Sequence, residues 1–181
     1  YYIMAISGAV GLIWKMKLPS MVMKACAPIG LGLTIVVLAT GSIWGKPTWG
    51  TWWEWDARLT SYLILSFLYL GAIALQQAFQ NRDTADKASA ILALVGTVNI
   101  PIIYKSVDWW YTLHQPATLK IVGKSTIDPS MLYPLFVMII GFYVFFTLVL
   151  ILYTRTEILR RESRTQWVKE LVLANSSKIG R

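Results

Sequence analysis

Residues 131–153 read MLYPLFVMIIGFYVFFTLVLILY and contain no charged side chain. The hydrocarbon core of a bilayer is about 30 Å thick and a helix rises about 1.5 Å per residue, so roughly 20 apolar residues are needed to cross it. This stretch is therefore predicted to be a membrane-spanning helix, and it decides the class of fold.

Three further uncharged stretches precede it, namely Ala25–Trp44, Leu59–Phe79 and Ala88–Tyr104. The third is the shortest, but Tyr104 can sit at the membrane interface, where aromatic residues are enriched. Tyr1–Trp14 is apolar but too short to span, and it is interpreted as the end of a helix whose beginning lies outside this sequence. We expect an all-α fold, a polytopic transmembrane helix bundle with four full spans and a partial first span.

The overall composition agrees with this fold. The 181 residues are 56% hydrophobic and 14% charged, which is too apolar for an ordinary soluble domain. The net charge of +8 does not indicate a nucleic-acid partner, because the basic residues gather at the ends of the apolar stretches. We expect the protein to contact membrane lipid rather than nucleic acid. Cys26, the single cysteine, excludes a disulfide and a C-x-x-C-H haem attachment site, and it is interpreted as a packing residue.

The basic residues also predict an orientation, because cytoplasmic segments of membrane proteins are enriched in lysine and arginine. If residues 154–181 form a basic cytoplasmic tail, counting back along the spans places the loops 45–58 and 105–130 on the outer side. Twelve basic residues then lie inside and five outside. The predicted organisation is a transmembrane domain over residues 1–153 followed by this tail. Both outer loops would share one face of the membrane.

The tail contains the amphipathic stretch ILRRESRTQWVKELVL at residues 158–173. We expect an interfacial helix here rather than a separate domain. Its apolar face, turned to lipid or to a partner, would carry Ile158, Leu159, Trp167, Leu171 and Val172.

The loop between the first two full spans is unusually rich in tryptophan. The stretch GSIWGKPTWGTWWEWDARLT, residues 41–60, contains Trp44, Trp49, Trp52, Trp53 and Trp55. A belt of interfacial aromatic anchors explains two or three of them. Five within twelve residues, interleaved with charged side chains, are better explained by a flat aromatic surface for a ligand.

Asp56 and Arg58 lie near the end of this stretch, and each has two interpretations. Asp56 can favour the start of a helix through the helix dipole, or it can orient the arginine or an indole N–H. Arg58 can be an interfacial arginine, or its planar guanidinium can pair with a carboxylate of a ligand.

His114 is the only histidine, and it follows the pair Trp109 and Trp110 in VDWWYTLHQP, residues 107–116. A single loop histidine is usually only a solvated residue. An imidazole can, however, ligate haem iron. Aromatic platforms, a cation for propionates and an imidazole for iron together match the chemistry of haem. No second histidine is present, so this chain's histidines provide only one axial ligand.

Two segments resemble a known family. WGKPTWGTWWEWDARLTS, residues 44–61, looks like the WWD motif of haem-handling membrane proteins. The continuation Asp-Ala-Arg-Leu-Thr after the last tryptophan resembles the branch of cytochrome c maturation protein C (CcmC), the haem exporters. NIPIIYKSVDWWYTLHQ, residues 99–115, resembles a later periplasmic segment of that branch.

The resemblance implies a six-helix protein of the bacterial inner membrane, with a periplasmic site that holds b-type haem transiently and without a covalent bond. His114 would be an axial ligand of the haem iron. The platform would consist of Trp49, Trp52, Trp53 and Trp55, with Asp56, Arg58, Trp109 and Trp110 completing the site. The implied partners are the ATPase CcmA, the membrane subunits CcmB and CcmD, and the haem chaperone CcmE.

Two other functions remain open. A cytochrome c haem lyase or synthetase of the same superfamily shares the tryptophan motif, although it usually continues differently after the aspartate. A structural membrane subunit would use the tryptophans only as anchors. The chain has no P-loop, so ATP hydrolysis is expected in a partner, and no enzyme activity is predicted for this chain.

Overall fold

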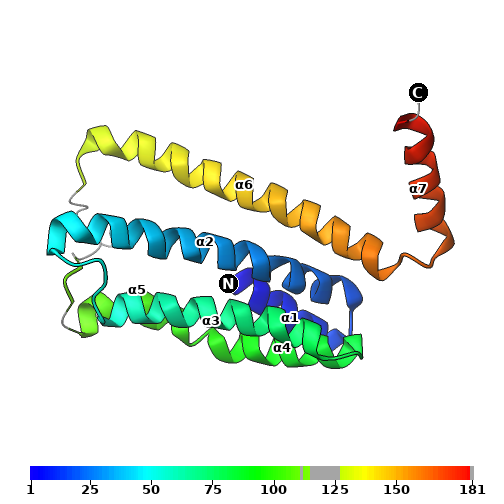
Figure 1. The fold of residues 1–181 in the computed structure, drawn as a ribbon, viewed down its shortest axis with the longest axis horizontal. Coiled ribbons are helices and arrows are strands. Elements are labelled where there is room, and N and C mark those ends of the chain that lie inside the picture. The colour runs from blue at the N-terminus through cyan, green and yellow to red at the C-terminus, as the bar shows by residue number, and fades with distance from the viewer. Residues whose placement is uncertain (111, 115–126, 180–181) are drawn as a thin grey trace.

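The computed structural model describes residues 1–110, 112–114 and 127–179, and most of these residues lie in α-helices (Figure 1). Their bounds are α1 Tyr2–Trp14, α2 Lys17–Trp49, α3 Ala57–Ala78, α4 Arg82–Gly96, α5 Asn99–Trp109, α6 Pro129–Arg161 and α7 Gln166–Ile179.

Four segments are long and apolar enough to cross a membrane: α2, α3, α4 together with α5, and α6. The predicted spans lie within them, except that the second ends at Phe79, one residue after α3, and α1 is a shorter apolar helix. The prediction of an all-α transmembrane bundle with four full spans is therefore confirmed.

The second helix is longer than predicted at both ends. It runs from Lys17 to Trp49, so Lys17 and Lys24 lie in α2 rather than in the connection to α1. The connection between α2 and α3 is correspondingly shorter than the predicted loop 45–58. The helical hydrogen bonding continues through this region, and the amide of Gly50 still donates to the carbonyl of Lys46 at 3.1 Å. Helices routinely extend beyond the hydrocarbon core into the headgroup layer, where charged side chains are solvated.

The third span is divided into two helices, α4 and α5. At the division, the Thr97 and Val98 amides donate to carbonyls three residues earlier rather than four, at 3.2 and 3.3 Å. Pro101 accounts for the change, because its ring lacks an N–H and clashes with the carbonyl of residue 97 in a regular helix. Asn99 stabilises the division by donating from Nδ2 to the carbonyl of Ser61 in α3, at 2.9 Å.

The core lies among α1, α2, α3 and α4, and it is built largely from small or flexible side chains such as Met4, Met23, Ala90 and Ala93. A Cβ atom on Gly8 would lie 3.0 Å from Met23 Sδ and 3.3 Å from Ala90, so glycine allows close helix contact here. Small residues at helix interfaces are typical of membrane bundles.

The helix α6 packs mainly on α2 and has no buried residue. It continues past the predicted boundary at 153/154 to Arg161, so Ile158 and Leu159 belong to the last spanning helix. The tail helix is separate, because the chain turns after Arg161 and α7 begins at Gln166. The expected tail helix is therefore present, but it begins at Gln166, eight residues after the start of the amphipathic stretch. Trp167 and Val172 are exposed on α7 as the amphipathic pattern requires.

The helix ends form two groups at opposite ends of the bundle (Figure 1). One end, called the tryptophan end, contains the C-termini of α2 and α5 and the N-termini of α3 and α6. The other, called the basic end, contains the α1–α2 and α3–α4 connections and the C-terminus of α6. The two tryptophan segments therefore lie at the same end, as predicted.

Candidate functional site

The last turns of α2 place the first two tryptophans of the site. Trp44 and Trp49 meet edge to face, with ring centroids 5.3 Å apart. The helix ends at Gly50, whose φ of 80° is a left-handed conformation that glycine adopts without strain. The turn at Gly50 reverses the chain immediately after Trp49.

Asp56 begins α3 and is buried, with 8% of its surface exposed. Its Oδ1 accepts a hydrogen bond from the Leu59 amide at 2.8 Å, which makes it the N-cap of α3. Burial raises the pKa of the Asp56 carboxyl, but hydrogen bonds from Thr112, the Leu59 amide and His114 outweigh it and hold the pKa below its ordinary value. The carboxylate is therefore ionised at neutral pH.

The second oxygen of Asp56 contacts the histidine. His114 Nδ1 lies 2.6 Å from Asp56 Oδ2, and the imidazole is largely buried. Thr112 joins both residues, since its hydroxyl donates to Asp56 Oδ2 and lies 3.1 Å from His114 Nδ1. The ring of His114 also meets the ring of Trp49 edge to face, at 4.6 Å between centroids.

These contacts fix the imidazole in one orientation. With a proton on Nδ1 directed at a carboxylate, the neutral ring presents the lone pair of Nε2 to a ligand. Metal-binding histidines commonly have this arrangement, with the non-ligating nitrogen donating to a carboxylate. Asp56 thus caps the helix as one interpretation expected. The side chain that it orients is that of His114, not that of Arg58.

The other predicted aromatic residues form pairs. Trp53 and Trp55 meet edge to face at 5.4 Å, and Trp109 and Trp110 do so at 5.8 Å. Trp52 is more than half exposed and has Lys46 Nζ 5.9 Å from its ring. Among the described residues, no ring contact joins the Trp109–Trp110 pair to the tryptophans of the α2–α3 connection.

Two buried polar atoms of the site have no hydrogen-bond partner within the described part of the chain. They are Trp53 Nε1 and Arg58 Nε. Arg58 lies in the first turn of α3, two residues after Asp56. Buried N–H groups are rarely left unpaired in native proteins, so these donors are suited to an acceptor on a ligand.

Sequence reasoning did not identify Thr112 as part of this site, nor did it anticipate the contact between Asp56 and His114. The only local signal for Thr112 is its position two residues before the histidine, where its Oγ1 accepts from the His114 amide at 3.2 Å.

Comparisons with known proteins identify close relatives. Heme exporter protein C of Escherichia coli strain K12 is 48% identical over 178 residues, which cover 98% of this chain and 71% of the relative. The protein of the same name from Bradyrhizobium diazoefficiens is 48% identical, with 98% of this chain and 68% of the relative covered. The one from Haemophilus influenzae is 47% identical, covering 94% and 70%.

The CcmC family, described as Heme exporter protein C, matches residues 1–169, a range that contains both tryptophan segments and His114. Identity near one half over almost the whole chain accompanies this match. The four candidate spans are those of a multi-pass membrane protein. This chain therefore belongs to the Heme exporter protein C (CcmC) family.

Proposed function

We propose that this protein binds haem at the tryptophan end, with Nε2 of His114 as an axial ligand of the iron. The observation that carries the proposal is the 2.6 Å contact between His114 Nδ1 and Asp56 Oδ2. This contact would leave Nε2 as the ligating nitrogen and would fix the tautomer and orientation of the ring. Membership of a family named for haem export supports haem as the ligand.

The surrounding residues fit a large, flat, dianionic ligand. Trp49 and Trp53 come from either side of Gly50, and Trp52 and Trp55 are exposed at the same end of the bundle. We assign these four tryptophans to the platform. The unpaired Nε–H of Arg58 can donate to a propionate, and the unpaired Nε1–H of Trp53 can donate to a second acceptor on the ligand. We assign Trp109 and Trp110 to the same surface, because Trp110 lies four residues before His114.

We further propose that the haem is passed from this surface to the chaperone CcmE, within a complex that also contains CcmA, CcmB and CcmD. An open aromatic surface supports transfer, because a ligand held there remains accessible to a partner. On this view the tryptophan end faces the periplasm of a bacterial inner membrane, and the basic tail faces the cytoplasm. The excess of lysine and arginine at the basic end supports this orientation.

The first experiment compares absorption spectra of the purified protein and of His114→Ala, each with added haem. We expect a Soret band that is lost or shifted in the variant. Free imidazole should restore it, because a small ligand can occupy the position vacated by the side chain. An unchanged band in His114→Ala would assign the ligand elsewhere. No band in either protein would favour tryptophans that serve only as anchors.

The transfer step is tested separately from binding. The haem-loaded protein is incubated with CcmE or with an apocytochrome c, and covalent haem adducts are then detected on denaturing gels. We expect an adduct with CcmE alone. An adduct formed directly with the apocytochrome would identify a haem lyase instead.

A further inference from the structure

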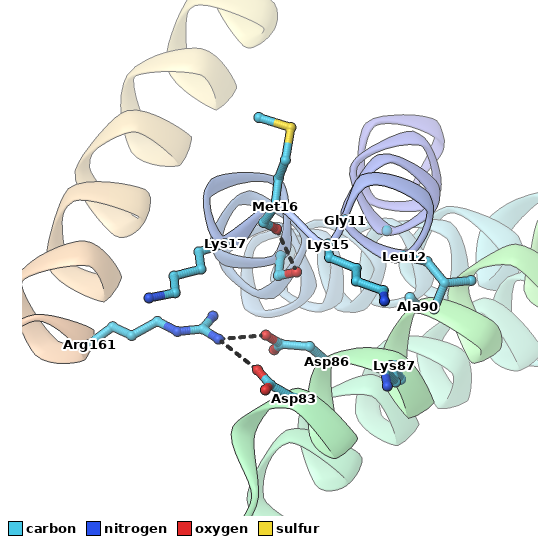
Figure 2. A pocket seen from close by; sticks show the side chains of 12 residues that line it. Gly11, Leu12, Lys15, Met16, Lys17, Asp83, Asp86, Lys87, Ala90 and Arg161 are labelled. Atoms are coloured by element: carbon cyan, nitrogen blue, oxygen red, sulfur yellow. Dashed lines mark hydrogen bonds and ion pairs between the residues drawn. The ribbon is translucent and has the colours of Figure 1, made fainter.

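The basic end contains a cleft that takes no part in the proposed haem site. It consists of a cavity of about 270 Å³, which α1, α2, α4 and the end of α6 line, and an adjoining one of about 550 Å³. The two share Lys17 and Arg161. Figure 2 shows the first cavity, with Lys15 from the α1–α2 connection, Lys17 from the start of α2, Lys87 from α4 and Arg161 from α6. We call the two cavities together the basic cleft.

The three carboxylates that line the cleft are already engaged. Glu162 accepts a hydrogen bond from Trp167 Nε1 at 2.9 Å, and one arginine engages the other two. Arg161 donates to Asp86 at 2.9 Å and lies 3.9 Å from Asp83, and its own side chain is only 11% exposed. This ion pair holds the end of α6 against the start of α4, as Figure 2 shows. Arg82 donates to the carbonyl of Arg161 at 3.2 Å and strengthens the same junction.

The remaining cations of the cleft exceed its anions. In the part of the chain that the structure describes, no carboxylate lies within 4.0 Å of Lys15, Lys17, Lys87 or Arg164. All four side chains are exposed. Such a cluster creates a positive potential that attracts anions, and its low-dielectric walls strengthen the attraction. The cleft is thus suited to a ligand with at least one negative charge.

The walls of the cleft are partly apolar. Leu12 and Met16 line the first cavity from the α1–α2 region, and both are more than a third exposed. Ala90 and two glycines of α1 form the floor. A site for a free inorganic anion has no need of exposed apolar side chains beside its cations. An amphipathic ligand, with an anionic group joined to hydrocarbon, matches both kinds of surface.

The position of the cleft supplies the last constraint. It lies where four spanning segments end, at the level of the bilayer headgroups. We propose that the basic cleft binds the phosphate headgroup of an anionic phospholipid, with the acyl chains extending along α1. Basic pockets between spanning helices have the chemistry for this recognition. The proposal does not depend on haem binding.

The test is native mass spectrometry of the purified protein with phosphatidylglycerol, compared with phosphatidylcholine of the same acyl chains. We expect tighter binding of phosphatidylglycerol. Each lysine near a headgroup is worth about fivefold in affinity, so Lys15→Gln with Lys17→Gln should weaken it by about 25-fold. Both side chains are exposed, so the fold should be retained.

A matched control removes the same charge outside the cleft, in Arg155→Gln with Lys169→Gln. An equal loss in the control would show general attraction of the basic end for acidic lipid, and would overturn a defined site. Inorganic phosphate provides the second arm. Displacement of the lipid by millimolar phosphate would show that a soluble anion, rather than a phospholipid, is the natural ligand. Equal binding of the two lipids would also overturn the proposal.

Discussion

At the residue scale, the two carboxylate oxygens of Asp56 have separate tasks. Oδ1 caps α3 through the Leu59 amide, and Oδ2 holds His114. The start of a spanning helix and the orientation of the imidazole therefore depend on one side chain. Since α3 packs on α2, α4 and α5, the position of the histidine depends on a helix that three neighbouring helices hold in place.

This double role predicts different effects for two substitutions of Asp56. Asparagine caps helices about as well as aspartate, so Asp56→Asn should leave thermal stability nearly unchanged. It removes the charge that supports His114, and haem affinity should fall by roughly 10- to 100-fold. Asp56→Ala should show the same loss of affinity and a further loss of stability of about 1 kcal/mol. Soret titration and thermal unfolding measure the two effects, and equal haem affinity in Asp56→Asn would contradict the positioning role.

Arg58 permits a separate test of the propionate contact. Removing a hydrogen bond to a charged group costs about 1.5–3 kcal/mol, so Arg58→Ala should weaken haem retention by roughly 10- to 100-fold. Arg155→Ala, an exposed arginine on α6, is the control and should have no effect. Retention is measured by the Soret absorbance that remains after gel filtration. Full retention in Arg58→Ala would leave this side chain as an interfacial arginine.

At the element scale, the spans could be predicted because a bilayer requires about 20 apolar residues, and stretches of this kind can be recognised in the sequence. The residues at which the helices begin and end could not be predicted. Lys46 and Pro47 suggest a loop, yet both lie in α2, which continues past the proline to Trp49. The division of the third span follows from Pro101 only when the neighbouring helix is known, because Asn99 needs the carbonyl of Ser61. Likewise, the contact between Asp56 and His114 joins residues 58 positions apart, which no local pattern specifies.

The end of α2 gives a prediction at this scale. Gly50 has a φ of 80°, and an alanine there would be strained although nothing lies within 4 Å of its Cβ position. Gly50→Ala should therefore destabilise the protein by about 1 kcal/mol. Gly41→Ala is the matched control, because Gly41 is helical and equally open, and alanine stabilises a helix interior relative to glycine. Thermal unfolding in detergent should separate the two variants, and the same sign for both would contradict the role assigned to the turn.

At the scale of the whole molecule, the length of the helices separates two groups of functional residues. Seven of the nine tryptophans lie with Asp56 and His114 in the segments at one end, and the ion pairs of Arg161 lie at the other (Figure 1). Because spanning helices alternate in direction, the two tryptophan segments must emerge on the same side of a membrane. The helical arrangement fixes this relation, and the charge asymmetry indicates which side is outermost.

The orientation can be tested with single cysteines at the two ends. Glu54 is exposed in the α2–α3 connection and Ser163 is exposed between α6 and α7, so Glu54→Cys and Ser163→Cys should both fold normally. The native Cys26 is buried in α2 and should contribute little background labelling. In intact cells with a permeabilised outer membrane, a membrane-impermeant maleimide should label Glu54→Cys but not Ser163→Cys. After lysis both should react. Labelling of Ser163→Cys in intact cells would invert the orientation and place the histidine, and with it the proposed delivery of haem, on the cytoplasmic face.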